Sequence, residues 1–516
     1  MFEKPAKVIV NYYLLNNLKM QTEKLPARTF NTNNECSHFV KKTITVFLAG
    51  AALLLHSCNK IEIKEQQPAA VSVTSDGDAI KLHPDQPNII LIMAEDMGYE
   101  VPTCNGGQSY KTPTLDLIAA TGMRFTQVHG SPMCAPSRWA LMTGKYNFRN
   151  YFYYGIMYTD QRTFANVLQD KGYRTAVYGK WALDGGDTSV HIFGFDEYSI
   201  WNPFKSNTIG LSEIEPAATN GSIYISSSLY ENGANVDRSL TDGKFSDDTY
   251  TDSVNNFIKA NRKVPFFVYY PMILSHKPAS PTPDDPEFPT WNPSNPDDTA
   301  FFASQVKYTD KKIRSIIDTV KRLRIESETI IMVLFGDNGT REGLTSLFNG
   351  QRVAGARQQP TEWGTHVPFL VYWPGTVAAG VVNNDLIDFT DFLPTIADIA
   401  KTSIPASYGK IDGVSFYPQL LGQTGTTRDW IYDYYWPVPN RPGLNGFYEW
   451  VQNKDYKLYD SSSLSMKGNF YKFENSTEKL PQLDVNLLTT DEKTTRKNLH
   501  DVLRMMHNDP EYRSPE

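Results

Sequence analysis

The sequence predicts an α/β protein, in which a large doubly wound sheet, mixed or parallel, is flanked by helices and followed by a smaller C-terminal antiparallel sheet subdomain. Short continuous apolar runs alternate with segments of helical periodicity, which is the strand–helix–strand order of doubly wound domains. Beyond residue 422 the chain changes to short aromatic stretches, which favours antiparallel strands. With 516 residues, 40% of them hydrophobic, the chain can bury a core in both parts.

The first predicted strand covers residues 88–94. Pro87 precedes this apolar run, and Glu95 and Asp96 follow it. A short apolar run with such boundaries is typical of a strand buried on both faces of a parallel sheet. Ligands of α/β folds bind beyond the carboxyl ends of these strands, so the two carboxylates are candidates for a functional site.

The following elements repeat this plan. A helix is expected to begin at Thr112-Pro113 and to end at Gly122, and the next helix to end at Gly172. The other predicted elements of the large domain are strands at 175–178, 266–270, 330–335 and 369–373, and helices at 164–168, 306–320 and 392–397. The smaller subdomain is expected to contain strands at 430–436 and 456–459 and a polar helix near 491–507.

The N-terminal region has the features of an export signal. Lys41 and Lys42 precede an apolar run at 43–55 that is too short to span a membrane stably. The run ends in Leu55-His56-Ser57-Cys58, which resembles a bacterial lipobox, so a lipid anchor is expected on Cys58; a simple secretory signal is the alternative. We therefore expect an exported lipoprotein, periplasmic or tethered to the outer membrane.

The predicted organisation has four parts. Residues 1–58 form an upstream segment with the lipoprotein-type signal, and the polar residues 59–85 form a linker. Residues 86–422 form the large domain, and residues 423–516 form the C-terminal subdomain.

Charge and cysteine content exclude two classes of protein. There are 50 Lys and Arg residues against 57 Asp and Glu residues, with a net charge of −7 and no long basic run, so no nucleic-acid partner is expected. The four cysteines are too few and too scattered for a disulfide framework or a CxxC metal site.

The most specific local pattern is Cys134-Ala135-Pro136-Ser137-Arg138. Because proline suits the first turn of a helix, Cys134 is expected at a helix N-terminus, where free N–H groups and the helix dipole favour an anionic ligand. A nucleophile for an anionic ester fits this place. From composition alone, a buried structural cysteine is the alternative.

A second candidate cluster pairs Glu95 and Asp96 with Asp337 and Asn338, which follow another predicted strand. Oxygen ligands at two strand ends suit a hard cation, with Ca²⁺ preferred and Mg²⁺ possible. For either pair alone, turn chemistry after a strand is the alternative.

The Cys-x-Pro-x-Arg spacing of Cys134, Pro136 and Arg138 resembles the signature that formylglycine-generating enzymes recognise in type I sulfatases. With the ordered segments around it, the chain is similar to this formylglycine-dependent family of the alkaline phosphatase superfamily over residues 86–422. The resemblance implies that a formylglycine-generating enzyme oxidises Cys134 to an aldehyde whose hydrate attacks sulfur. It also implies a catalytic centre that includes Arg138 and a metal site formed by Glu95, Asp96, Cys134, Asp337 and Asn338.

Three further catalytic residues are implied by the same resemblance. Lys180, in Gly179-Lys180-Trp181, would bind sulfate. His276, which follows the strand at 266–270 and precedes Pro278, would donate a proton to the leaving alcohol or bind a sulfate oxygen. Arg357 stands where the family has a second sulfate-binding lysine.

The chain departs from the family pattern at several positions. Glu95 replaces an aspartate, and Ala182 stands where most relatives have a histidine that takes the proton of the formylglycine hydroxyl. Trp363 and His366 replace a usual glycine and arginine near Arg357.

The sequence therefore predicts an enzyme that hydrolyses sulfate esters, on a sulfated carbohydrate, through formylglycine and a divalent metal. Two alternatives stay open. One is a catalytically weakened homologue that binds sulfated glycans, and the other is a phosphodiesterase or phosphonate hydrolase on the same scaffold.

Overall fold

The computed structural model describes residues 86–514, with gaps at 154–155, 158, 182, 184–185, 202–222, 293–294, 296, 437–445, 475–476 and 479–480. These residues belong to one compact unit, residues 78–516. The predicted signal, the lipid anchor on Cys58, the whole linker at 59–85 and the substitution Ala182 lie outside the described residues.

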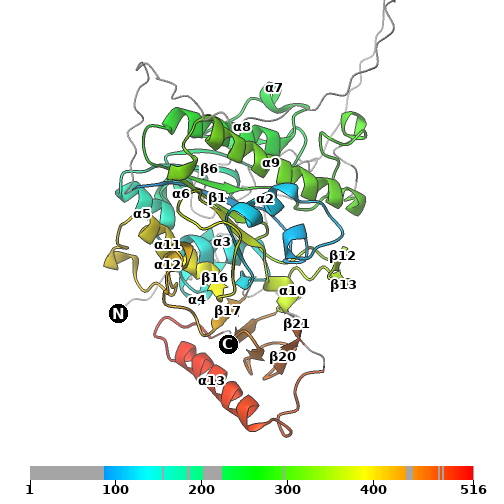
Figure 1. The fold of residues 1–516 in the computed structure, drawn as a ribbon, viewed down its shortest axis with the longest axis vertical. Coiled ribbons are helices and arrows are strands. Elements are labelled where there is room, and N and C mark those ends of the chain that lie inside the picture. The colour runs from blue at the N-terminus through cyan, green and yellow to red at the C-terminus, as the bar shows by residue number, and fades with distance from the viewer. Residues whose placement is uncertain are drawn as a thin grey trace, which may run out of the picture. The chain divides into compact units, whose positions relative to one another are not determined.

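A ten-stranded sheet forms the centre of the large domain (Figure 1). Strand β1 (Asn88–Met93) pairs in parallel with β10 (Phe266–Pro271) on one side and with β11 (Thr329–Leu334) on the other. Beyond β10, the parallel order continues through β6 (Arg174–Lys180) and β7 (Glu197–Trp201). The strands predicted at 88–94, 175–178, 266–270 and 330–335 are thus confirmed as neighbours whose carboxyl ends share one edge.

The outer strands make the sheet mixed. On the β11 side, β14 (Phe369–Tyr372) and β2 (Met123–Phe125) pair antiparallel to their inner neighbours, and β15 (Val381–Asn383) is parallel to β2. On the other side, the antiparallel strands β8 (Leu229–Glu231) and β9 (Ala234–Asn235) complete the sheet. The mixed alternative of the predicted fold class is therefore correct.

Successive residues of β1 enter two separate cores. Ile89 and Leu91 pack with the core that contains α3 (Cys134–Thr143), α5 (Phe164–Asp170) and α11 (Phe392–Ile399). Ile90 and Ile92 pack with the core that contains α2 (Pro113–Thr121), α8 (Ser246–Asn261) and α9 (Phe302–Arg322). All four side chains have no exposed surface, and burial of each contributes about 1.5–3 kcal/mol. Figure 1 shows these two helix layers on opposite faces of the sheet.

The main helices agree with the predicted ones, except that α8 was not predicted from the sequence. Their bounds are α2 (Pro113–Thr121), α3 (Cys134–Thr143), α5 (Phe164–Asp170), α8 (Ser246–Asn261), α9 (Phe302–Arg322) and α11 (Phe392–Ile399). Thr163 caps α5 by accepting a hydrogen bond from the Ala165 N–H at 3.1 Å, and its own N–H is bound by Asn166.

Shorter elements connect these layers. The helices among them are α4 (Asn147–Asn150), α6 (Gly186–Ile192), α7 (Arg238–Thr241), α10 (Glu362–Thr365) and α12 (Tyr417–Leu420). The strands are β3 (Val128–His129), β4 (Tyr151–Tyr153), β5 (Ile156–Met157), β12 (Thr345–Phe348), β13 (Gln351–Ala354) and β16 (Ile387–Asp388).

The C-terminal part contains the predicted antiparallel sheet and helix. Its strands are β17 (Ile431–Tyr435), β18 (Tyr448–Gln452), β19 (Tyr456–Tyr459), β20 (Phe470–Glu474) and β21 (Thr477–Glu478), in sequence order across the sheet. Helix α13 (Thr490–His507) buries Leu499, Leu503 and Met506 against this sheet. Arg149 of α4 joins this part to the large domain through an ion pair with Asp509.

Within the part of the chain that the structure describes, no helix combines the length and the apolar character needed to cross a bilayer.

A pH-dependent contribution to stability comes from Asp247 in α8. The carboxyl is fully buried, and it accepts a hydrogen bond from the Ile273 N–H at 3.3 Å. Burial raises the pKa of Asp247 to about 7, so the folded protein binds this proton more tightly than the unfolded chain. The resulting stabilisation is complete below about pH 4 and is lost as the pH rises through about 7.

We expect Asp247→Asn to reduce the fall in the free energy of unfolding between pH 5 and 8, by at most about 1.4 kcal/mol per pH unit. Urea denaturation at several pH values measures this slope. Asp252→Asn, at an exposed position of the same helix, is the matched control. Equal slopes for the Asp247 variant and the original protein would contradict the assignment.

Candidate active site

The polar strand ends of β1 and β11 meet at one edge of the sheet. The register pairs Met93 with Leu334, so the residues that follow the two strands lie side by side. The Asp96 N–H donates to Asp337 Oδ1 at 3.2 Å, and Asn338 Nδ2 donates to Asp96 Oδ1 at 2.9 Å. All three side chains are fully buried. The structure therefore brings together the two pairs that the sequence predicted as metal ligands.

Cys134 is the first residue of α3 and exposes 2% of its surface. One ligand atom each of Glu95, Cys134 and Asp337 lies within 4.8 Å of the other two. The side chain of Met133, the residue before the helix, makes no capping hydrogen bond. First-turn N–H groups lack partners within a helix, so this end of α3 favours an anion near Cys134.

Arg138 and Lys180 both contact the carboxylate of Glu95. Arg138 Nη2 pairs with one carboxylate oxygen, and Lys180 Nζ pairs with the other. Arg138 Nη1 also donates to the Lys180 carbonyl at 2.8 Å, and Arg138 Nε lies 3.8 Å from Asp337 Oδ2. Both cations are buried, so Glu95 is the anion that accommodates two positive charges inside the domain.

A close approach of two chain segments places Lys180. The preceding residue, Gly179, has φ +117°, and a Cβ there would lie 2.1 Å from the backbone oxygen of Pro271. Only glycine fits this position, because both the backbone conformation and the contact exclude a side chain. Lys180 consequently leaves the end of β6 beside the end of β10.

Arg357 reaches the same cluster from the loop after β13. Its Nε lies 3.0 Å from Asp96 Oδ1, and its backbone N–H donates to the Thr340 carbonyl at 2.9 Å. The next residue, Gln358, donates its N–H to the Pro132 carbonyl at 2.8 Å. The loop that carries Arg357 is thus attached to the segment leading into α3.

His276 lies on the loop that follows β10. This loop is fixed to the end of β1, because the Glu95 N–H donates to the Leu274 carbonyl at 2.8 Å and the Ser275 N–H donates to the Glu95 carbonyl at 3.2 Å. His276 Nδ1 lies 2.6 Å from the Lys277 carbonyl. Since a carbonyl only accepts, Nδ1 carries a proton and Nε2 is the nitrogen that is left for a substrate.

Burial controls the protonation of these groups. It raises the pKa of Asp96, with Arg357 acting in the opposite direction. It lowers the pKa of Lys180, with Cys134 acting in the opposite direction. Burial, reinforced by Lys180 and Arg357, also lowers the pKa of His276 well below its ordinary value, so this imidazole is neutral at pH 7.

The residues present fit a hard cation. Three buried oxygens accept no hydrogen bond from any described residue: Asp96 Oδ2, Asp337 Oδ2 and Asn338 Oδ1. Buried acceptors without partners are rare and costly, and a bound cation would satisfy all three. Glu95 differs from them, since both of its oxygens already pair with Arg138 and Lys180.

The sequence-based interpretation missed Arg341, which lies just beyond Asn338. The side chain exposes 3% of its surface, and its Nη1 contacts Asp297 at 2.7–2.8 Å. Its Nε and Nη2 are buried and donate no hydrogen bond to any described residue. The only signal in the sequence was its position shortly after a strand, which gives no information about burial.

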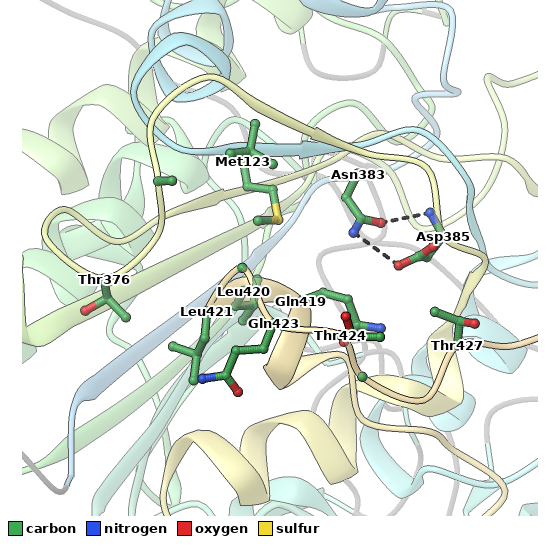
Figure 2. A pocket seen from close by; sticks show the side chains of 14 residues that line it. Met123, Thr376, Asn383, Asp385, Gln419, Leu420, Leu421, Gln423, Thr424 and Thr427 are labelled. Atoms are coloured by element: carbon green, nitrogen blue, oxygen red, sulfur yellow. Dashed lines mark hydrogen bonds between the residues drawn. The ribbon is translucent and has the colours of Figure 1, made fainter.

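A separate cavity of about 420 Å³ lies between β2, β15 and the segment after α12 (Figure 2). Figure 2 shows Asn383 and Asp385 joined by hydrogen bonds at its wall, and no lining residue belongs to the predicted site. The lining residues include no lysine or arginine.

Comparison with known families agrees with this geometry. The family model described as Sulfatase matches residues 87–402, and the model described as N-sulphoglucosamine sulphohydrolase, C-terminal, matches residues 361–508. The chain therefore belongs to the sulfatase family of the alkaline phosphatase superfamily, and it is a sulfuric ester hydrolase.

Individual relatives cover most of the chain. Arylsulfatase G of Rattus norvegicus is 28% identical over 415 residues, 72% of this chain and 76% of its own. N-acetylgalactosamine-6-sulfatase of Mus musculus is 28% identical over 369 residues, 66% of this chain and 67% of its own. The crystal structure of Ps i-CgsB aligns with a TM-score of 0.65 and 25% identity, over 84% of this chain and 94% of that one.

The phosphonate monoester hydrolase SpPMH from Silicibacter pomeroyi shares the fold alone. It aligns with a TM-score of 0.57 and 16% identity, over 82% of this chain and 96% of that one.

The ion pair between Arg138 and Glu95 gives a testable prediction. We expect Arg138→Met to lower the free energy of unfolding by about 3–5 kcal/mol, because it removes one of the two cations that pair with a buried carboxylate. Urea denaturation measures the loss. The double variant Glu95→Gln/Arg138→Met should be more stable than the sum of the two single variants implies. Strict additivity would show that the two charges are not coupled.

Proposed function

We propose that this enzyme removes sulfate from a sulfated carbohydrate, with formylglycine at position 134 as nucleophile and Ca²⁺ as the bound cation. The observation that carries the proposal is the buried cluster at the strand ends. There Cys134 lies beside oxygen ligands that lack partners and beside cations that could hold an anion.

Asp96, Asp337 and Asn338 would hold the cation, because each has one buried oxygen that accepts no hydrogen bond from a described residue. Oxygen-only ligands favour Ca²⁺, with Mg²⁺ as the alternative. The cation would polarise the sulfate oxygens and neutralise charge that develops there. Glu95 would act mainly through Arg138 and Lys180, which it holds in place.

Cys134 would act after oxidation to formylglycine by a formylglycine-generating enzyme. The hydrated aldehyde supplies a hydroxyl nucleophile and a second hydroxyl whose proton can leave, which divides one difficult displacement into two easier steps. The N-terminus of α3 would stabilise negative charge on the sulfate near this residue.

The cations and the imidazole have distinct places in this scheme. Lys180 and Arg357 would bind sulfate oxygens from the β6 and β13 sides of the site. His276 Nε2 would face the alcohol that leaves, since Nδ1 is bonded to the Lys277 carbonyl. A neutral imidazole can accept a hydrogen bond there or pass on a proton that it receives.

A carbohydrate substrate is supported by the relatives. One is named N-acetylgalactosamine-6-sulfatase, and the structure of Ps i-CgsB is known in complex with k-i-k-neocarrahexaose, with a TM-score of 0.65 and 24% identity to this chain. Arg341 offers buried donors near the site that could contact a further polar group of such a substrate.

The first prediction concerns the nucleophile. In protein produced with a formylglycine-generating enzyme, the peptide that spans Cys134 should have the mass of the aldehyde, and sulfate release should vanish in Cys134→Ala. Mass spectrometry and an assay on sulfated sugars measure the two effects. Full activity in Cys134→Ala would contradict the mechanism, and faster turnover of phosphate or phosphonate esters would favour the other reaction class.

The second prediction concerns the cation. Asp337→Asn should lower sulfate release by about 10²-fold or more and should raise the Ca²⁺ concentration needed for half-maximal activity, because it removes a charged ligand. Titration with Ca²⁺ after chelation measures both effects. Asp385→Asn, in the separate cavity of Figure 2, is the control and should behave like the original protein. An unchanged Ca²⁺ requirement in Asp337→Asn would refute this ligand assignment.

The third prediction concerns location. We propose that the enzyme is exported and anchored by lipid on Cys58. The full-length protein should sediment with membranes in a bacterial host, and Cys58→Ser should move it to the soluble or secreted fraction. Fractionation followed by immunoblotting measures this change, and an unchanged distribution would exclude a lipid anchor at this cysteine.

A further inference from the structure

A second cluster of metal-binding side chains lies outside the active site. His129 ends β3, Glu362 begins α10, and His366 directly follows that helix. One ligand atom of each residue lies within 4.8 Å of the other two. The three residues expose only 4%, 2% and 0% of their surface, so they are separated from bulk water.

The orientation of His366 is that of a metal-bound imidazole. Its Nε2 lies 2.8 Å from the Thr126 carbonyl, so Nε2 carries the proton and Nδ1 has a free electron pair. Nδ1 faces Glu362 Oε1 at 3.3 Å. An electron pair directed at a carboxylate is repulsive unless a proton or a cation lies between them. Histidine ligands of metals commonly donate their second N–H to a backbone carbonyl in this way.

His129 gives the second observation. Neither of its ring nitrogens makes a hydrogen bond with a described residue, and the same holds for Nδ1 of His366. His129 Nε2 lies 3.8 Å from Glu362 Oε1. A buried polar atom without a partner destabilises the folded protein.

We propose that His129, Glu362 and His366 bind a Zn²⁺ ion that is distinct from the hard cation of the active site. Two imidazoles and one carboxylate form a ligand set typical of Zn²⁺, whereas the active-site oxygens suit Ca²⁺. Tetrahedral Zn²⁺ with bonds of about 2.0–2.2 Å places its ligand atoms about 3.3–3.6 Å apart. The separations of 3.3 and 3.8 Å are close to this value.

The ion would connect three parts of the protein. His129 lies on the segment that leads to Cys134, and Glu362 lies on the segment that follows Arg357. Gln452 of β18 donates its Nε2 to Glu362 Oε2 at 3.2 Å, and its own buried Oε1 has no partner among the described residues, so it is a candidate fourth ligand. The zinc would thus fix the loops of the nucleophile and of the sulfate-binding arginine to the C-terminal sheet.

Metal analysis and X-ray absorption of the purified full-length protein test this proposal. After dialysis with excess Ca²⁺, we expect one zinc per chain by mass spectrometry, with nitrogen and oxygen neighbours and imidazole scattering at the zinc edge. Protein that contains no zinc after expression with added zinc would overturn the proposal. A sulfur neighbour would also overturn it, because none of the proposed ligands contains sulfur.

Variants locate the ion independently of activity. His129→Gln and His366→Gln should each lower the zinc content at least about tenfold, while Asp337→Asn and the exposed His500→Gln should keep it. Circular dichroism checks that the variants fold. If a variant does not fold, the X-ray absorption spectrum of the original protein tests the proposal in its place. Zinc retained in both histidine variants would overturn the assignment, and zinc lost in Asp337→Asn would assign the ion to the active site instead.

Discussion

The pairing of Glu95 with Arg138 and Lys180 is the interaction on which the rest of the active site depends. Two buried cations approach one carboxylate at the end of the central strand, and each comes from a different element. An unpaired charge at this buried position would destabilise the folded protein, because the cost of desolvating it is on the order of several kcal/mol. The glutamate therefore determines where α3 and the end of β6 can lie relative to β1.

The length of the Glu95 side chain suits this arrangement. The carboxylate of Glu95 reaches Arg138 and Lys180, while one oxygen each of Asp96, Asp337 and Asn338 accepts no hydrogen bond from a described residue. Glu95 thus pairs with the two cations, whereas its neighbours keep oxygens for the proposed metal ion. Arg357, whose Nε lies 3.0 Å from Asp96 Oδ1, balances the charge of Asp96.

Some parts of the fold and of the site could be predicted from the sequence, and others could not. Apolar runs such as 88–94 and 330–335 could be predicted because burial on both faces requires an unbroken apolar sequence. The antiparallel direction of β14 could not be predicted, since strand direction leaves no mark in a single apolar run. The buried donors of Arg341 and the approach of His129 to His366 depend on packing between distant segments, so no local pattern signals them.

The near-complete burial of Cys134 has a consequence for the proposed oxidation to formylglycine. In the folded protein the residue exposes 2% of its surface, at the start of a helix that packs in the core on one face of the sheet. A modifying enzyme that must reach the thiol would therefore act before this segment folds. Maturation would then depend on whether the modifying enzyme acts before the segment folds. A chain that folds first would stay inactive even though its structure is complete.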